Sequence, residues 1–330
     1  MEDRKKKNIR RILTGAAAGA AAVMVPIPGA FTVAAGAVGV NTMFEALFER
    51  GGLAESKPFA VGTEFESPAD EGQRWCDSMP QQPVQITAQD GISLAAHYLP
   101  CPNEKRTVIL CHGWHGHWDR DLSQQAKWLY ENGSSLLLIE QRAHGSSGGE
   151  YLTFGLLERH DLRCWIDWIN DIYHPQSLYL LGQSMGGTTV LMAGGDPDLP
   201  PNVRGIIDDC GFTSPYEQIL NAARNRLAEV PEHPVMDLLD KEARVRMGVG
   251  LKDYSAVDAM RVTKTPVVFI HGMADKTVAY DRTMENYVAC KAPKKLVLVE
   301  NAAHCMCWYL DKEQYTQALT EFFAENDIKI

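Results

Sequence analysis

The sequence predicts an α/β fold built on a mostly parallel sheet of eight strands flanked by helices, with a small helical cap. Past residue 83, short aliphatic or β-branched runs alternate with amphipathic stretches of helical length, which is typical of an α/β sheet. The apolar runs are hydrophobic throughout, as expected of parallel strands that are buried on both faces. The interval 212–264 is too long for one crossover helix, so we expect the cap there.

The first two strands are predicted as a hairpin. Residues 84–87 and 93–99 flank Asp90 and Gly91, a dipeptide that favours a tight turn. The later apolar runs predict further strands, and the stretches with helical spacing between them predict the flanking helices. The further strands are expected at 107–111, 135–139, 178–181, 203–207, 267–270 and 296–299, and the helices at 121–131, 156–172, 186–193, 280–290 and 312–324.

Composition and charge exclude several classes of protein. The chain has 330 residues, 45% of them hydrophobic and 22% charged, which is ordinary for a globular protein and excludes a disordered or collagen-like chain. Its formal net charge of −10 argues against nucleic acid as a partner. The eight cysteines form no C-x-x-C pattern, so we expect reduced thiols.

A G-x-S-x-G motif stands at 182–186, between a predicted strand and a predicted helix. Glycine two residues before and two residues after the serine allows a sharp turn, which exposes the hydroxyl of Ser184 at the C-terminal edge of the sheet. The N-terminus of the following helix favours negative charge that develops there. We therefore predict Ser184 as a nucleophile.

A serine hydroxyl needs a base within hydrogen-bond reach and a carboxylate that orients the base. Asp275 and His304 each follow a later predicted strand, so both are expected at the same sheet edge as Ser184. Their order along the chain is nucleophile, acid, base, as this motif requires. Asp208 or Asp209, which follow another strand, are alternatives for the carboxylate.

Attack by a serine creates an oxyanion, which needs two N–H donors already aimed at it. One donor is expected from the backbone of Met185, the residue after the nucleophile. The other is expected from the backbone of Trp114, where Gly113 permits a sharp turn after the strand at 107–111.

Together these motifs resemble those of the serine hydrolases of the α/β-hydrolase superfamily, and the resemblance covers about residues 83–326. The chain is similar to small bacterial hydrolases with a short helical cap and an N-terminal membrane segment, whose catalytic domains are like those of prolyl-oligopeptidase-type peptidases and monoacylglycerol lipases. The resemblance implies hydrolysis through an acyl-enzyme without a cofactor. One departure is Ala143, where relatives commonly carry glycine. The matching motifs are HGW at 112–114, RAHGSSGG at 142–149, GQSMGG at 182–187, HGMAD at 271–275 and the final His304.

We therefore predict a serine hydrolase that cleaves small-molecule carboxylic esters. A peptidase or amidase that uses the same three residues is the alternative within enzymes, and a non-catalytic binding protein of the same fold is the alternative outside them. His112, His115 and His117 lie close together in the sequence, and His304, Cys305 and Cys307 offer further soft ligands. A metal site is nevertheless not expected, because zinc needs ligands that converge in tetrahedral geometry and because His112 and His304 have better uses. Cys305 and Cys307, next to the predicted base, either make activity sensitive to oxidation or are simply buried.

The N-terminal part, residues 1–50, is predicted as an apolar helical segment. No charged residue occurs over 12–44, and a basic cluster precedes this run, so we favour a membrane anchor with an extracytoplasmic catalytic domain. A signal peptide cleaved near 35–37 and a cytoplasmic protein on which small-residue helices pack are the alternatives. The polar stretch 51–82 is expected to be a linker, and 83–330 the catalytic domain.

Overall fold

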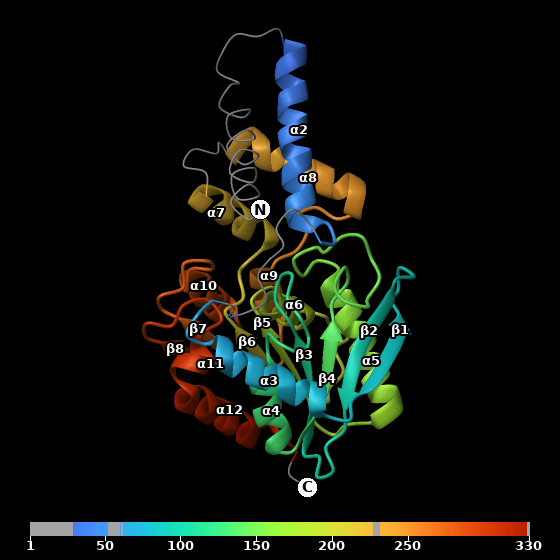
Figure 1. Cartoon of the computed structure of the whole chain (residues 1–330), viewed down its shortest axis with the longest axis vertical. Helices are drawn as coiled ribbons and strands as arrows, with labels where there is room; N and C mark the ends of the chain where they lie inside the picture. Colours follow the sequence, from blue (N-terminus) through green and yellow to red (C-terminus); the bar gives the residue numbers. More distant parts are fainter. Residues whose placement is uncertain (1–28, 52–59, 61, 227–231, 329–330) are drawn as a thin grey trace.

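The computed structural model describes the chain except residues 1–28, 52–59, 61, 227–231 and 329–330. Its centre is one sheet formed by β1 (Gln82–Thr87), β2 (Ser93–Leu99), β3 (Arg106–Cys111), β4 (Ser134–Glu140), β5 (Leu178–Gln183), β6 (Val203–Asp209), β7 (Val267–Gly272) and β8 (Lys294–Val299). The strand order is β1-β2-β4-β3-β5-β6-β7-β8 (Figure 1). Only the β1–β2 and β2–β4 pairings are antiparallel among these strands, so the predicted mostly parallel sheet of eight strands is confirmed.

Helices cover both faces of the sheet, which explains why the central strands are apolar throughout. In β3, Ile109 and Cys111 enter one hydrophobic layer, and Val108 and Leu110 enter the other. One layer contains α5 (Glu158–Tyr173), α6 (Met185–Ala193), α9 (Ala256–Val262) and α10 (Asp281–Ala289), and the other contains α4 (Ser123–Glu131), α11 (Cys307–Leu310) and α12 (Lys312–Asn326).

The stretch expected as a linker contains a helix, α3 (Glu66–Ser78), that packs on α4. Ala69, Gly72 and Cys76 of α3 are buried, and they lie three and four residues apart, on one face of the helix. A Cβ on Gly72 would lie 2.3 Å from the Ser123 hydroxyl oxygen, so the two helices approach closely. The charged residues of α3 mask this narrow apolar face in the sequence.

The expected helical insertion consists of α7 (Pro215–Arg226), α8 (Glu232–Met247) and α9. Figure 1 shows α7 and α8 above the end of the sheet from which β5 leads into α6, whereas α9 lies beside α6. The insertion therefore supplies a cap of two helices and one helix of the main layer.

The helix α2 (Gly29–Phe48) lies across α8 in Figure 1. Phe44 and Phe48 of α2 are fully buried in a cluster with cap residues, and the Arg246 guanidinium lies 4.7 Å from the centre of the Phe44 ring. Within the described chain, no helix has the length and apolar character needed to cross a membrane. The expected membrane anchor with an extracytoplasmic domain is therefore contradicted; residues 12–28 of the expected span lie outside the described part.

Candidate active site

Ser184 lies in the turn between β5 and α6, where its backbone has a φ of 56° and a ψ of −116°. Such a conformation is strained for a residue with a side chain. A Cβ on Gly182 would lie 2.1 Å from the Gly186 carbonyl oxygen, and one on Gly186 would lie 2.0 Å from the Cys111 carbonyl oxygen. Both glycines are therefore required for the turn that presents the Ser184 hydroxyl.

The structure brings Ser184, His304 and Asp275 together at the C-terminal edge of the sheet. The His304 Nε2 lies 2.9 Å from the Ser184 hydroxyl oxygen, and the His304 Nδ1 lies 2.6 Å from Asp275 Oδ2. Asp275 follows β7 and His304 follows β8, and these parallel neighbours deliver their loops to the same edge. The three side chains form an unbroken hydrogen-bonded path.

The Asp275 carboxylate is held by four donors. Its Oδ1 accepts backbone N–H bonds from Thr277 and Val278 at 2.8 and 2.9 Å, and its Oδ2 accepts from His304 and from His271 Nε2, the latter at 3.2 Å. Burial alone would raise the pKa of Asp275, but the hydrogen bonds from His271 and His304 outweigh burial and lower this pKa below its usual value. The carboxyl group is therefore ionised at neutral pH.

The pKa of His304 is raised above its usual value. Burial opposes the charged imidazolium, but the neighbouring Cys210 and the hydrogen bond to the Asp275 carboxylate favour it more strongly. Of these two, the fixed negative charge of Asp275 is the cause that holds at neutral pH, because burial raises the pKa of the Cys210 thiol well above its usual range. A raised pKa gives the imidazole the proton affinity that a base requires.

The two alternative carboxylates make other contacts. Asp208 Oδ1 accepts a hydrogen bond from the Gly211 N–H at 3.0 Å, and Asp209 Oδ2 accepts one from the Tyr315 hydroxyl at 3.1 Å. Burial raises the pKa of Asp208 to about 8 and that of Asp209 to about 6. Neither carboxylate accepts a hydrogen bond from the ring of His304 in the described structure.

The loop after β3 lies against the nucleophile. A Cβ on Gly113 would lie 3.6 Å from the Ser184 Cβ, and the Gly113 N–H donates to Asp121 Oδ2 at 3.1 Å. Within the described residues, the backbone N–H groups of Trp114 and Met185 donate to no other group of the chain. Both N–H groups therefore have no acceptor within the described chain, as is required of groups that are to donate to an oxyanion.

The surroundings of the nucleophile are mainly apolar and aromatic. Met185 and Phe212 are buried in one cluster with the cap, and Trp114 packs on its margin. The Phe154 ring lies 6.1 Å from the Phe212 ring and 5.5 Å from the Phe48 ring of α2, measured between centroids. The hydrophobic cluster that begins at Met185, next to the nucleophile, therefore joins the main domain, the cap and α2.

A polar cavity of about 280 Å³ lies behind the loop after β3. Its lining contains none of the three hydrogen-bonded residues described above. His112, which lines it, has both ring nitrogens occupied, because Nδ1–H donates to the Gly113 carbonyl and Nε2 accepts from the Gln141 N–H. The lining residues are His97, His112, Gly116, His117, Trp118, Asp119, Glu140, His144, Gly145 and Ser146.

Comparison with known proteins finds similar families, relatives and structures. Residues 102–246 match a family model described as serine aminopeptidase, S33. The uncharacterized protein YqkD of Bacillus subtilis is 25% identical over 247 residues, which are 74% of this chain and 80% of YqkD. The uncharacterized protein YfhR of Escherichia coli K12 is 29% identical over 241 residues, 69% of this chain and 75% of YfhR. The Pyrococcus furiosus esterase Pf2001 has a similar structure, with a TM-score of 0.61 and 21% identity over 82% of this chain and 99% of the esterase. The chain has the α/β-hydrolase fold, and these similarities support its membership of the α/β-hydrolase superfamily.

Two parts of this α/β hydrolase were not foreseen from its sequence. The first is Cys210, whose Sγ lies 3.5 Å from the Sγ of Cys305, whereas the sequence drew attention to Cys305 and Cys307. The second is α2, which contributes Phe48 to the apolar cluster. Nothing in the sequence marks Cys210, because its proximity to Cys305 depends on the order of the strands in the sheet.

Proposed function

We propose that this α/β hydrolase cleaves carboxylic esters through an acyl-enzyme formed on Ser184. The supporting observation is the hydrogen-bonded path from the Ser184 hydroxyl through His304 to Asp275, with distances of 2.9 and 2.6 Å. A serine hydroxyl is a weak nucleophile until a base within hydrogen-bond reach takes its proton. This path supplies the base and the carboxylate that orients it.

In the proposed mechanism, the Ser184 oxygen attacks the acyl carbon while His304 Nε2 takes the hydroxyl proton. Asp275 holds the Nδ1–H and stabilises the imidazolium that forms. The N–H groups of Trp114 and Met185 donate to the oxyanion of the tetrahedral intermediate. Collapse breaks the bond to the alcohol, which leaves with the proton from His304. A water molecule then attacks the acyl group in the same way, and the acid is released.

The apolar surroundings of the nucleophile favour an ester with a hydrophobic acyl group. Met185, Phe154 and Phe212 belong to the apolar cluster that begins next to the nucleophile, and burial of an acyl chain against apolar side chains contributes about 25 cal/mol per Å². A peptidase is the second candidate, favoured by the match to the serine aminopeptidase model. A free peptide amine needs a carboxylate partner in a largely dry site, and the cluster around Met185 consists of hydrophobic residues.

The test combines active-site labelling with turnover. Wild type, Ser184→Ala and Ser146→Ala are treated with a fluorophosphonate and measured by intact mass, and each is assayed with p-nitrophenyl acetate, butyrate and octanoate and with aminoacyl p-nitroanilides. Ser146 is exposed and outside the hydrogen-bonded path, so its variant is the matched control. We expect labelling and ester turnover in wild type and in the control, and neither in Ser184→Ala. Labelling of Ser184→Ala contradicts the nucleophile, and faster turnover of anilides than of esters contradicts the ester assignment.

A further inference from the structure

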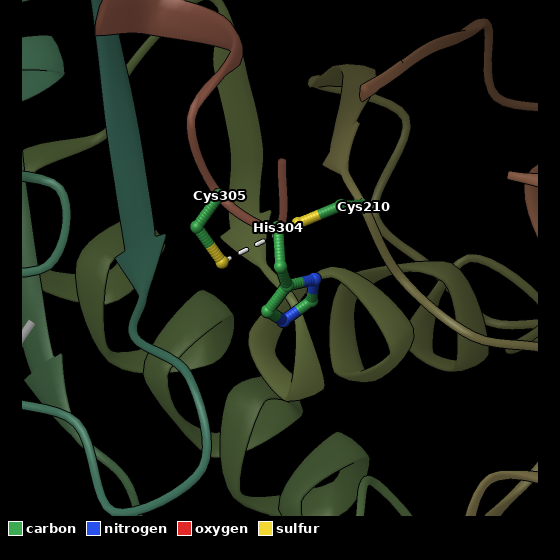
Figure 2. Close-up of side chains that lie close together, drawn as sticks. All are labelled: Cys210, His304 and Cys305. Carbon is green, nitrogen blue, oxygen red and sulfur yellow. Dashed lines mark hydrogen bonds between the residues drawn. The ribbon is translucent and has the colours of Figure 1, made fainter. Parts of the chain in front are cut away.

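Two cysteine thiols lie beside the proposed base. Cys210 directly follows β6 and Cys305 lies in the loop after β8, yet their Sγ atoms are 3.5 Å apart. Figure 2 shows the two sulfur atoms facing each other across His304, with the imidazole ring directed away from the line between them. Both cysteines are buried. Fold topology, not proximity in sequence, therefore creates a pair of thiols next to a histidine.

The backbone of both cysteines is in the left-handed region. The φ of Cys210 is 53° and that of Cys305 is 63°. For a residue with a side chain this conformation costs about 1–2 kcal/mol and persists only where the surrounding structure imposes it. Both residues of the pair carry this strain, so the surrounding structure fixes the backbone from which each thiol projects.

We propose that Cys210, Cys305 and His304 form a binding site for a soft divalent metal ion of the Zn²⁺ or Cd²⁺ type. The ligand atoms of these three residues all lie within 4.8 Å of one another. With Zn–S bonds of about 2.3 Å, the observed S–S separation gives an S–Zn–S angle of about 100°, close to tetrahedral. An imidazole nitrogen becomes the third ligand when the ring turns toward the sulfur atoms, and water takes the fourth position.

Metal binding at this site blocks the proposed catalysis. The two ring nitrogens of His304 face Ser184 and Asp275, so a metal that takes either nitrogen breaks the path between them. The inhibition rests on the proposed function, whereas the binding itself does not. The site is thus inhibitory, and its occupation is reversible by a chelator.

The charge balance favours the complex despite the burial. Burial raises the pKa of Cys305 to about 11 and that of Cys210 well above its usual value, because a single thiolate in this place is uncompensated. A divalent ion with two thiolates is neutral, so burial opposes it far less. Binding converts two thiols to thiolates and releases two protons to solvent, and a third proton leaves where the imidazole of His304 is protonated in the metal-free protein. The neighbouring carboxylates, Asp209 on β6, Asp275 after β7 and Asp121 before α4, all favour a cation.

The experiment measures binding directly, with Zn²⁺ or Cd²⁺ alone as the probe. Calorimetry in two buffers of different ionisation enthalpy counts the protons released per Zn²⁺, and the ultraviolet absorbance of Cd²⁺–thiolate bonds counts the sulfur ligands. The full chain is used as wild type, Cys210→Ser and Cys305→Ser. Cys101→Ser is the matched control, because Cys101 is a partly exposed thiol far from this site in the sequence. Thermal unfolding checks that each variant is folded.

We expect wild type and Cys101→Ser to bind one metal ion with two thiolate ligands and with an affinity that rises as the pH is raised. Two protons should be released from the thiols, and a third where the imidazole of His304 is protonated in the metal-free protein. Each variant at Cys210 or Cys305 should lose more than about 100-fold in affinity. Zn²⁺ inhibition of ester turnover, taken relative to the uninhibited rate of each variant, should weaken in parallel. Absence of metal binding by wild type, or binding by both cysteine variants that is as tight as that of wild type, overturns the proposal. If a variant does not fold, the number of thiolate ligands and the number of protons released on metal binding to wild type still test the proposal. Absence of ester turnover leaves the binding result intact, so the two failures are distinguishable.

Discussion

Replacement of Asp275 by asparagine tests the proposed mechanism most directly, because it removes a negative charge and replaces an accepting oxygen by a donating NH₂ group without changing the shape of the side chain. An asparagine keeps an oxygen that can accept from the Thr277 and Val278 N–H groups, so the loop after β7 retains its anchors. Its amide NH₂ group then faces His304 Nδ1 in place of Oδ2. The ring is driven to the tautomer with a proton on Nε2, which cannot accept the Ser184 proton.

The magnitude follows from the loss of both contributions of the carboxylate. In a serine triad, the wrong tautomer of the histidine and the lost stabilisation of its imidazolium together lower kcat by about 10⁴-fold. This loss corresponds to about 5.5 kcal/mol of transition-state free energy. The pKa of His304 should fall in the variant, because the fixed charge of Asp275 that raises it is removed. KM should change little, since the carboxylate is fully buried beneath the histidine and does not reach the substrate.

The assay is p-nitrophenyl butyrate turnover across a pH series for wild type, Asp275→Asn and Asp208→Asn. Asp208 is the matched control, because it is a buried carboxylate at the same sheet edge that does not bond to the ring of His304. We expect the control to stay within about tenfold of wild type, a difference of about 1.4 kcal/mol. A folded Asp275→Asn variant with turnover near that of wild type would refute the assignment of the acid, and a larger loss in Asp208→Asn would transfer that role to Asp208.

Four further measurements test other parts of the structure. The kcat/KM of wild type should fall as the pH drops through the raised pKa of His304, because only the neutral imidazole accepts a proton; a midpoint below the usual histidine value of about 6.5 contradicts this. Burial raises the pKa of Asp208 to about 8, so its contribution to stability is complete below about pH 4 and is lost as the pH rises through 8; the gain in melting temperature of Asp208→Asn over wild type should grow across that range, and a constant difference refutes it. Phe48→Ala should lower the free energy of unfolding by about 3–5 kcal/mol in a denaturant titration, and a loss below about 1 kcal/mol would mean that α2 does not dock on α8. Ala143→Gly should change that free energy by less than about 1 kcal/mol, because relief of a φ of 60° is offset by lost methyl burial and by backbone entropy; a change in kcat would contradict a purely local role.

The sheet could be predicted from the sequence because each central strand is a short apolar run with polar or glycine-containing ends. The run at 107–111 became β3 with a shift of one residue, since its alternate residues must fill two hydrophobic layers. The helix α3 could not be predicted in the same way. Its buried face is the narrow stripe of Ala69, Gly72 and Cys76, and the charged and polar residues around this stripe give the segment the composition of a linker.

The candidate site could be predicted because its residues are tied to strand ends. Ser184 is constrained by two glycines whose substitution would cause atomic overlap, and Asp275 and His304 follow neighbouring strands. Cys210 follows the same rule but escaped attention, because a free cysteine after an apolar run has no motif of its own. Its relation to Cys305 depends on strand order, which only the structure supplies.

The helix α2 shows why an apolar sequence alone does not distinguish a helix buried in lipid from one buried against protein. Lipid and protein both bury apolar side chains, so the pattern that favoured an anchor fits a helix packed on a cap equally well. In the structure, the Leu47 carbonyl at the end of α2 accepts a hydrogen bond from Trp114 Nε1–H at 3.0 Å. Trp114 also carries one of the two backbone N–H groups proposed to bind the oxyanion. The helix thus contacts the residue whose backbone must be aimed at the substrate, and Phe48→Ala should reduce ester turnover as well as stability if this contact holds the loop in place.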